Sequence, residues 1–161
     1  MLKHAICIPT LVAAVALSAC SQGSTATSPL GSTRVAQPSH RVKADATSTS
    51  VTIDNTYSSQ IALEGTSSSC LTGSPPSEVP ANSSSSPFTV SFDPSCASNI
   101  GYFDMTYGPA NGVAADTCKF NINYVVSTGT FSYSVTNNAN TTCSYHLGIT
   151  PGTVTFVYVH I

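Results

Sequence analysis

The sequence predicts an all-β protein, an antiparallel β-sandwich of about eight strands, and three observations lead to this prediction. Between Thr49 and Ile161, apolar and polar residues alternate in short runs, which is the periodicity of a half-buried strand. Turn-forming residues separate the runs at intervals of roughly eight to fifteen residues. Valine, isoleucine, phenylalanine and tyrosine supply most of the large side chains, and these residues favour strands over helices. A small closed barrel has the same signature and is the alternative architecture.

The first predicted strands surround a long segment without alternation. Val51 with Ile53, and Ile61 with Leu63, predict two strands on either side of the turn at residues 54–56. A third run alternates phenylalanine and valine with threonine and serine over residues 88–92. Between the second and third strands, residues 66–87 contain several prolines and a serine run, which predict a long loop.

Five further strands complete the predicted domain, at residues 100–107, 118–126, 131–135, 143–147 and 154–158. The clearest alternation places five side chains on one strand face: Cys118, Phe120, Ile122, Tyr124 and Val126. The short connection at residues 127–129 leads to Phe131, Tyr133 and Val135 and therefore predicts a hairpin.

Residues 1–19 have the features of a secretory signal peptide. Lys3 and His4 precede an apolar run of about fifteen residues, whereas a helix needs roughly twenty to cross a bilayer. The run closes on Leu17-Ser18-Ala19-Cys20, which resembles the lipobox of bacterial lipoproteins. This resemblance implies cleavage before Cys20 and a diacylglyceryl group on its thiol. The alternative is an ordinary cleavage site in which Cys20 takes no part.

The residues after Cys20 predict where the protein is located and a flexible tether. Lipoproteins retained at the inner membrane of Gram-negative bacteria commonly carry aspartate at the next position, and this chain carries Ser21. We therefore expect a place in the bacterial cell envelope, on the outer membrane. Residues 20–48 have no apolar period and are rich in small and polar residues, so they predict a flexible tether before the domain at 49–161. Its cations Arg34, Arg41 and Lys43 either rest on anionic lipid or belong to a solvated linker.

The cysteines predict two disulfides. Cleavage removes Cys7 and lipidation occupies Cys20, which leaves an even set: Cys70, Cys96, Cys118 and Cys143. None of these forms a Cys-x-x-Cys pair, so neither a zinc site nor a redox pair is expected. Three pairings are possible, and we favour Cys70 with Cys96 and Cys118 with Cys143 because each closes a local loop of about 25 residues.

No set of residues in the sequence predicts a reaction. We expect no catalytic residues, no metal and no cofactor, because the domain offers only His146 and His160 as bases and its acids are scattered singly. The formal net charge of −2 argues against nucleic acid as a partner.

Tyrosines are the candidate binding residues, although most of them alternate in register with core residues. Tyr102 and Tyr107 lie five apart in one predicted strand and should therefore point to opposite faces, near a loop end where a partner could bind. The sequence Pro-Pro-x-x-Val-Pro at 75–80 and Gly-Tyr-Phe-Asp-Met-Thr-Tyr-Gly at 101–108 is similar to the middle of aegerolysin-like β-sandwiches. This similarity implies only the sandwich fold.

Together these patterns predict a lipid-anchored envelope lipoprotein that binds a protein or glycan partner and is not an enzyme. One alternative is a periplasmic inhibitor or immunity-type lipoprotein whose acidic domain blocks a basic protein. The other is a small envelope hydrolase, which needs His146 or a pair of acids in a cleft.

Overall fold

The computed structural model describes residues 40–43, 47–110, 116–138 and 140–161. The predicted signal peptide at 1–19, the lipobox cysteine Cys20 and the tether before residue 40 lie outside the described residues. Within the described part, no helix is both long enough and apolar enough to cross a membrane.

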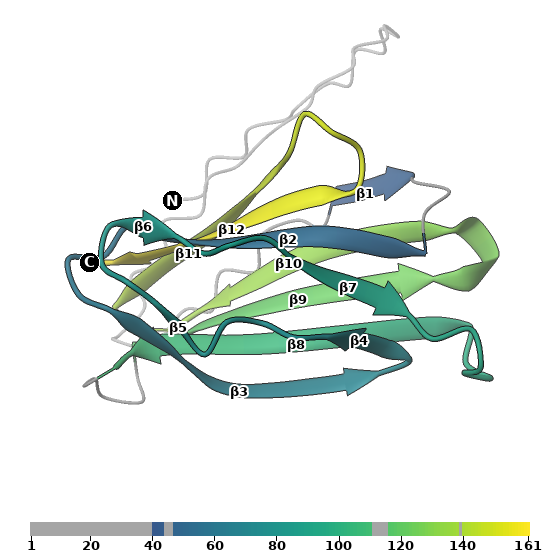
Figure 1. Cartoon of the computed structure of the whole chain (residues 1–161), viewed down its shortest axis with the longest axis horizontal. Coiled ribbons are helices and arrows are strands. Elements are labelled where there is room, and N and C mark those ends of the chain that lie inside the picture. Colours follow the sequence, from purple (N-terminus) through teal and green to yellow (C-terminus); the bar gives the residue numbers. More distant parts are fainter. Residues whose placement is uncertain (1–39, 44–46, 111–115, 139) are drawn as a thin grey trace, which may run out of the picture. The chain divides into compact units, whose positions relative to one another are not determined.

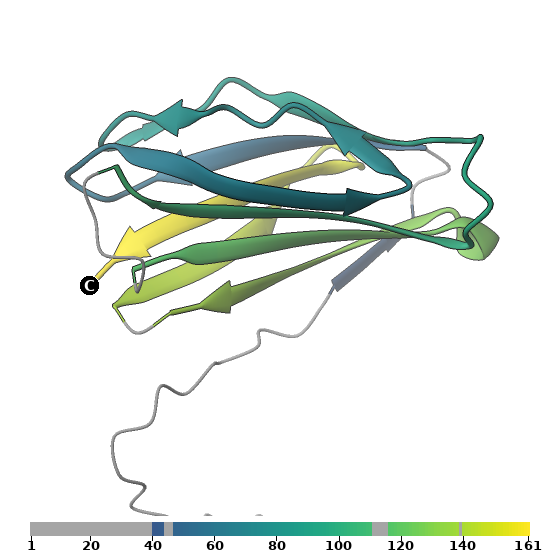
Figure 2. The same cartoon turned by 90° about the horizontal axis from the view of Figure 1, so that it is seen from below.

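Two sheets of six strands face each other as a β-sandwich, so the predicted fold class is confirmed (Figures 1 and 2). We call them sheet A and sheet B. Sheet A has the order β1 (His40–Lys43), β10 (Thr130–Asn137), β9 (Cys118–Val125), β8 (Ile100–Pro109), β3 (Ile61–Ser69) and β5 (Glu78–Val79). Sheet B has the order β11 (Thr141–Leu147), β12 (Thr153–His160), β2 (Ser48–Asn55), β7 (Phe88–Phe92) and β4 (Leu71–Gly73), and β6 (Ser83–Ser84) pairs with β2.

All strand pairs are antiparallel except one. β12 runs parallel to β2, with Thr153 opposite Ser50 and Tyr158 opposite Asn55. A parallel neighbour requires a long connection, and here nearly the whole domain connects the two strands. This one pair departs from the antiparallel arrangement of the predicted sandwich.

All eight predicted strands are present, and the predicted loop at 66–87 is the main correction. β3 continues to Ser69, and β4, β5 and β6 all lie within this segment. Residues 64–69 are exposed on both faces, so their sequence carries no alternation although their backbone pairs with β8. The three other strands are two or three residues long, too short to show a period.

Two further boundaries differ from the prediction. β1 lies inside the segment assigned to the tether and pairs with β10, Lys43 opposite Thr130. Four residues are too few to reveal a strand in the sequence.

Val126 does not continue the β9 face, because a 3₁₀ turn at Val126–Thr128 starts there and leaves its side chain 39% exposed. Gly129 then closes the predicted hairpin with a positive φ of 61°, a conformation that glycine adopts without strain.

The core lies between the sheets and is rich in aromatic rings. Phe120 of β9 stacks on Phe156 of β12 with ring centroids 4.8 Å apart. The hydroxyls of Thr49 and Tyr133 form a buried hydrogen bond of 2.7 Å, which also joins sheet B to sheet A. Five of the tyrosines are buried, as their alternation predicts: Tyr107, Tyr124, Tyr133, Tyr145 and Tyr158.

Both predicted disulfides are confirmed. Cys118 of β9 bonds to Cys143 of β11, so this bridge joins the two sheets through the core. Cys70 bonds to Cys96 and ties the junction of β3 and β4 to the loop that follows β7.

Candidate functional site

A groove of about 500 Å³ opens where the short strands β5 and β6 approach β7. We call it the serine–proline groove after the residues that line it: Ser74, Pro76, Glu78, Pro80, Ser84, Ser85, Ser86, Pro87 and Phe88. All of them lie in or next to the segment that the sequence predicts as a loop. The groove is therefore built by the segment whose short strands the sequence does not predict.

One wall of the serine–proline groove is fixed to β2. The Ser85 amide donates to the Ile53 carbonyl at 2.8 Å, and the Ser85 hydroxyl accepts from the Ile53 amide at 3.0 Å. The Ser84 hydroxyl donates to Asp54 at 3.0 Å. These bonds hold Ser84 of β6 and the following Ser85 against β2 in sheet B.

Buried Asn55 fixes the opposite wall. Its amide nitrogen donates to the carbonyls of Ser59, Val79 and Pro80 at 2.9–3.1 Å, and its side-chain oxygen accepts from the Tyr57 amide. Its side chain has no exposed surface. A single side chain at the end of β2 therefore holds the backbone of β5 and of Pro80 in place.

Tyr107 belongs to the support of the groove and not to a binding surface. Its ring is fully buried, and its hydroxyl donates to the carbonyl of Pro76, a lining residue, at 2.7 Å. Burial raises the pKa of Tyr107 well above its ordinary value, so the hydroxyl keeps the proton that it donates. A partner cannot reach this ring, which corrects the expectation that Tyr107 binds one directly.

Tyr102 points to the other face of β8, as the spacing predicts, and is 40% exposed. It pairs with Asn123 on β9 and lies beside Cys70. It does not line the serine–proline groove, so the structure does not bring the two tyrosines into one site.

The two histidines whose side chains the structure describes, His146 and His160, lie apart. His146 is exposed near the end of β11. His160 Nε2 lies 3.3 Å from Asp116 Oδ2, and its ring stacks on Tyr57 with centroids 4.5 Å apart. Within the part of the chain that the structure describes, neither histidine bonds to a serine or threonine hydroxyl, and no three metal-ligating side chains gather.

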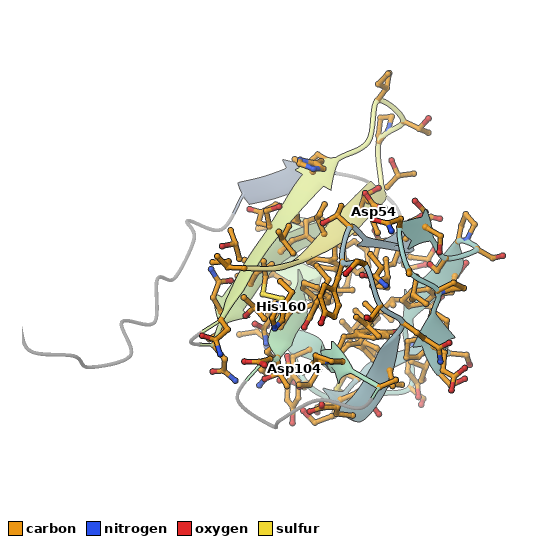
Figure 3. The ribbon with its side chains drawn as sticks, turned by 90° about the vertical axis from the view of Figure 1, so that its left-hand side faces the viewer. Asp54, Asp104 and His160 are labelled. Carbon is orange, nitrogen blue, oxygen red and sulfur yellow. A yellow bond between two sulfur atoms is a disulfide. The ribbon has the colours of Figure 1, made fainter. Side chains whose placement is uncertain are left out.

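Acidic side chains collect at one end of the sandwich, which we call the acidic end: Asp54, Glu64, Glu78 and Asp116. Asp54 lies at the end of β2, Glu78 pairs with Ala62 where β5 meets β3, and Glu64 lies two residues further along β3. Asp116 accepts from Asn140 at 2.7 Å and holds His160. Figure 3 looks onto this end and labels Asp54 and His160. Lys119, the one cation whose side chain is described, pairs instead with Asp104 at 2.8 Å further along β8.

A comparison of the chain with protein-family models and with curated proteins finds no match to either.

Proposed function

We propose that the chain is a non-enzymatic lipoprotein of the bacterial cell envelope, anchored to the outer membrane through lipidated Cys20, that binds a glycan in the serine–proline groove. The lipobox sequence supports the anchor. The groove is the observation that carries the binding role, because it is a concave surface with converging polar groups held on rigid backbone.

The chemistry of the serine–proline groove fits a carbohydrate. Sugars present rows of hydroxyls between apolar C–H faces. The groove offers the hydroxyls of Ser74 and Ser86, the carboxylate of Glu78, and the apolar surfaces of its prolines and Phe88. Hydroxyls can both donate and accept, and the carboxylate accepts, so each can replace a water that a sugar hydroxyl loses. Only one lining residue is charged, which favours a neutral glycan.

The test is calorimetric titration of the full-length protein with soluble fragments of envelope polysaccharides. Ser86 is exposed and lines the groove, so Ser86→Arg places a long side chain inside it and should abolish binding. The matched control is Ser68→Arg, at an exposed position on β3 outside the groove, which should leave the affinity unchanged. Binding that survives Ser86→Arg, or no binding to any fragment, would contradict the proposal.

The acidic end favours a second candidate, an inhibitor or immunity-type lipoprotein that blocks a basic protein. Charge of one sign at one end speeds the association of an oppositely charged partner and makes the rate depend on salt. A single basic protein that co-purifies with the chain from envelope extracts, and whose association slows in Glu64→Gln with Glu78→Gln, would support this role. Co-purification unaffected by the double variant would contradict it.

A further inference from the structure

Exposed apolar side chains lie at the end of the sandwich opposite the acidic end and on the β11–β12 turn that projects beside it (Figure 1). Six large hydrophobic residues are exposed among the described residues, and five of them belong to this group: Ile100, Tyr102, Val126, Leu147 and Ile149. We call this end the apolar end. Of the charged side chains that the structure describes, only Asp93 lies in its turns and loops.

Register and contacts place these residues on the part of the sandwich away from the acidic end. Ile100 pairs with Val125, directly before the β9–β10 turn that carries Val126. Thr153, directly after the β11–β12 turn, pairs with Ser50 near the start of β2. The two sheets meet here through the rings of Phe92 and Tyr124, with centroids 5.0 Å apart. In Figure 1 the start of β2 and the β9–β10 turn lie on the right, the β11–β12 turn rises at the top, and the C-terminal residue lies on the left.

The β11–β12 turn is the most exposed part of the apolar end. Ile149 is fully exposed, Leu147 is 40% exposed, and residues 147–153 contain no charge. The turn is held firmly at its base, because the Gly152 carbonyl accepts from the Ser50 amide at 2.8 Å and from the Thr49 hydroxyl at 2.9 Å. It also projects from sheet B (Figure 1). Exposed apolar side chains on a fixed turn mark a contact with a partner or a membrane.

The path of the chain indicates that the apolar end contacts a membrane. β2 begins at the apolar end, and β1 finishes there at Lys43, which pairs with Thr130. Nineteen residues, 21–39, join Cys20 to β1. The flexible tether that the sequence predicts would have a root-mean-square span of about 24 Å over that length, so an anchored Cys20 would keep the domain close to its bilayer and at a high effective concentration. Weak apolar contacts are then sufficient to hold one orientation.

We propose that the apolar end docks on the bilayer that holds Cys20, with Leu147 and Ile149 inserted among the lipid headgroups. The inference rests on the lipid anchor of the proposed function. Insertion removes apolar surface from water without burying a charge. The acidic end then faces away from the membrane, and the serine–proline groove, which adjoins β6 at the far end of β2, is presented to the surroundings.

The test uses the full-length lipidated protein in vesicles of phosphatidylethanolamine and phosphatidylglycerol. A polarity-sensitive fluorophore is attached at Thr150→Cys, beside the intact Leu147 and Ile149, and in a second sample at Ser58→Cys, an exposed position between β2 and β3 at the acidic end. Lipids brominated near the headgroup should quench the probe at position 150 several-fold more strongly than the probe at position 58. Equal quenching at both positions would overturn the proposal.

Substitutions of exposed apolar side chains at the two ends test which of them contact the membrane. The double variant Leu147→Ser with Ile149→Ser should abolish the excess quenching at position 150. Ile161→Ser removes a comparably exposed side chain, 79% exposed, that follows β12 at the opposite end, and should leave the quenching unchanged. The probe at 150 would instead be shielded from water without being quenched if a second copy of the protein covered the turn, and this shielding would rise with the density of protein in the membrane. That result would overturn the proposal.

Mass spectrometry of the N-terminal peptide shows whether the lipid anchor or the docking proposal has failed. If Cys20 carries lipid and the probe at 150 is not quenched, the docking proposal fails and the anchor stands. If Cys20 carries no lipid, the anchor fails, and the docking proposal, which rests on it, fails with it.

Discussion

Three buried tyrosines make the stability of the domain sensitive to alkaline pH. Burial raises the pKa of Tyr107, Tyr133 and Tyr158, and the nearby Asp116 carboxylate raises that of Tyr158 further. The Thr49 hydroxyl opposes this effect at Tyr133 without reversing it. The folded state therefore holds these protons more tightly than the unfolded chain does.

The sign of the pH dependence follows from this difference. Below the unfolded value of 10.0 both states are protonated, and the stabilising contribution is fully present. Above it, the unfolded chain loses protons that the folded state keeps, so the free energy of unfolding should fall as pH rises. Chemical denaturation at a series of pH values checks this prediction, with Tyr133→Phe as a variant that should weaken the alkaline loss. A free energy of unfolding that stays constant above pH 10 would contradict it.

Asn55 is the polar residue on which the groove walls depend. Asn55→Ala removes the amide group whose two N–H donors serve the carbonyls of Ser59, Val79 and Pro80, so it should lower the free energy of unfolding by about 2–4 kcal/mol. Asn123→Ala, at a half-buried position on the outer face of β9, should cost less than about 0.5 kcal/mol. Equilibrium denaturation measures both, and equal losses would show that Asn55 does not hold the groove.

At the scale of the elements, the two disulfides offer a controlled comparison. They close loops of nearly equal length, 26 and 25 residues, so chain entropy predicts a similar loss of about 3.5 kcal/mol for either bridge. Cys118 and Cys143 are also buried between the sheets, whereas Cys70 is half-buried. Replacing both members of a pair by alanine should therefore cost more for Cys118–Cys143. A larger loss for Cys70–Cys96 in urea denaturation would contradict this ranking.

The sequence predicts the elements that bury one face and misses those that do not. β9 and β10 alternate strictly because Phe120, Ile122 and Tyr133 fill the core, and their hairpin was predicted with its turn. The second half of β3 and the strands β4 to β6 are held by backbone pairing, which leaves no periodicity to read. The disulfides followed from cysteine number and spacing.

The candidate site could not be predicted for the same reason. The serine–proline groove is assembled from residues 74–88, whose shape depends on bonds to Ile53, Asn55 and Tyr107 far away in the sequence. The only signal in the sequence was the length of the segment, since long loops in compact domains are often functional. Tyr107 was singled out as a residue, but its role as a support required the fold.

At the scale of the whole molecule, the domain is polarised from end to end. Four of the six acids of the described residues lie at the acidic end, and five of the six exposed large hydrophobics lie at the apolar end, where β2 begins. In the proposed arrangement, a domain tethered by a lipid at Cys20 gains a fixed orientation from this polarity. The proposed glycan site and the proposed membrane contact then occupy different parts of one fold, and substitutions in one should leave the other intact.

The lipid on Cys20 is the claim on which this arrangement depends, and mass spectrometry of the N-terminal peptide tests it most directly. The full-length gene product is expressed in a Gram-negative host, and the membrane fraction is digested and analysed. We predict a mature chain that begins at Cys20 and carries a diacylglyceryl thioether, and we expect Cys20→Ser to abolish this modification. A mature chain that begins elsewhere, or an unmodified Cys20 thiol, would contradict the account.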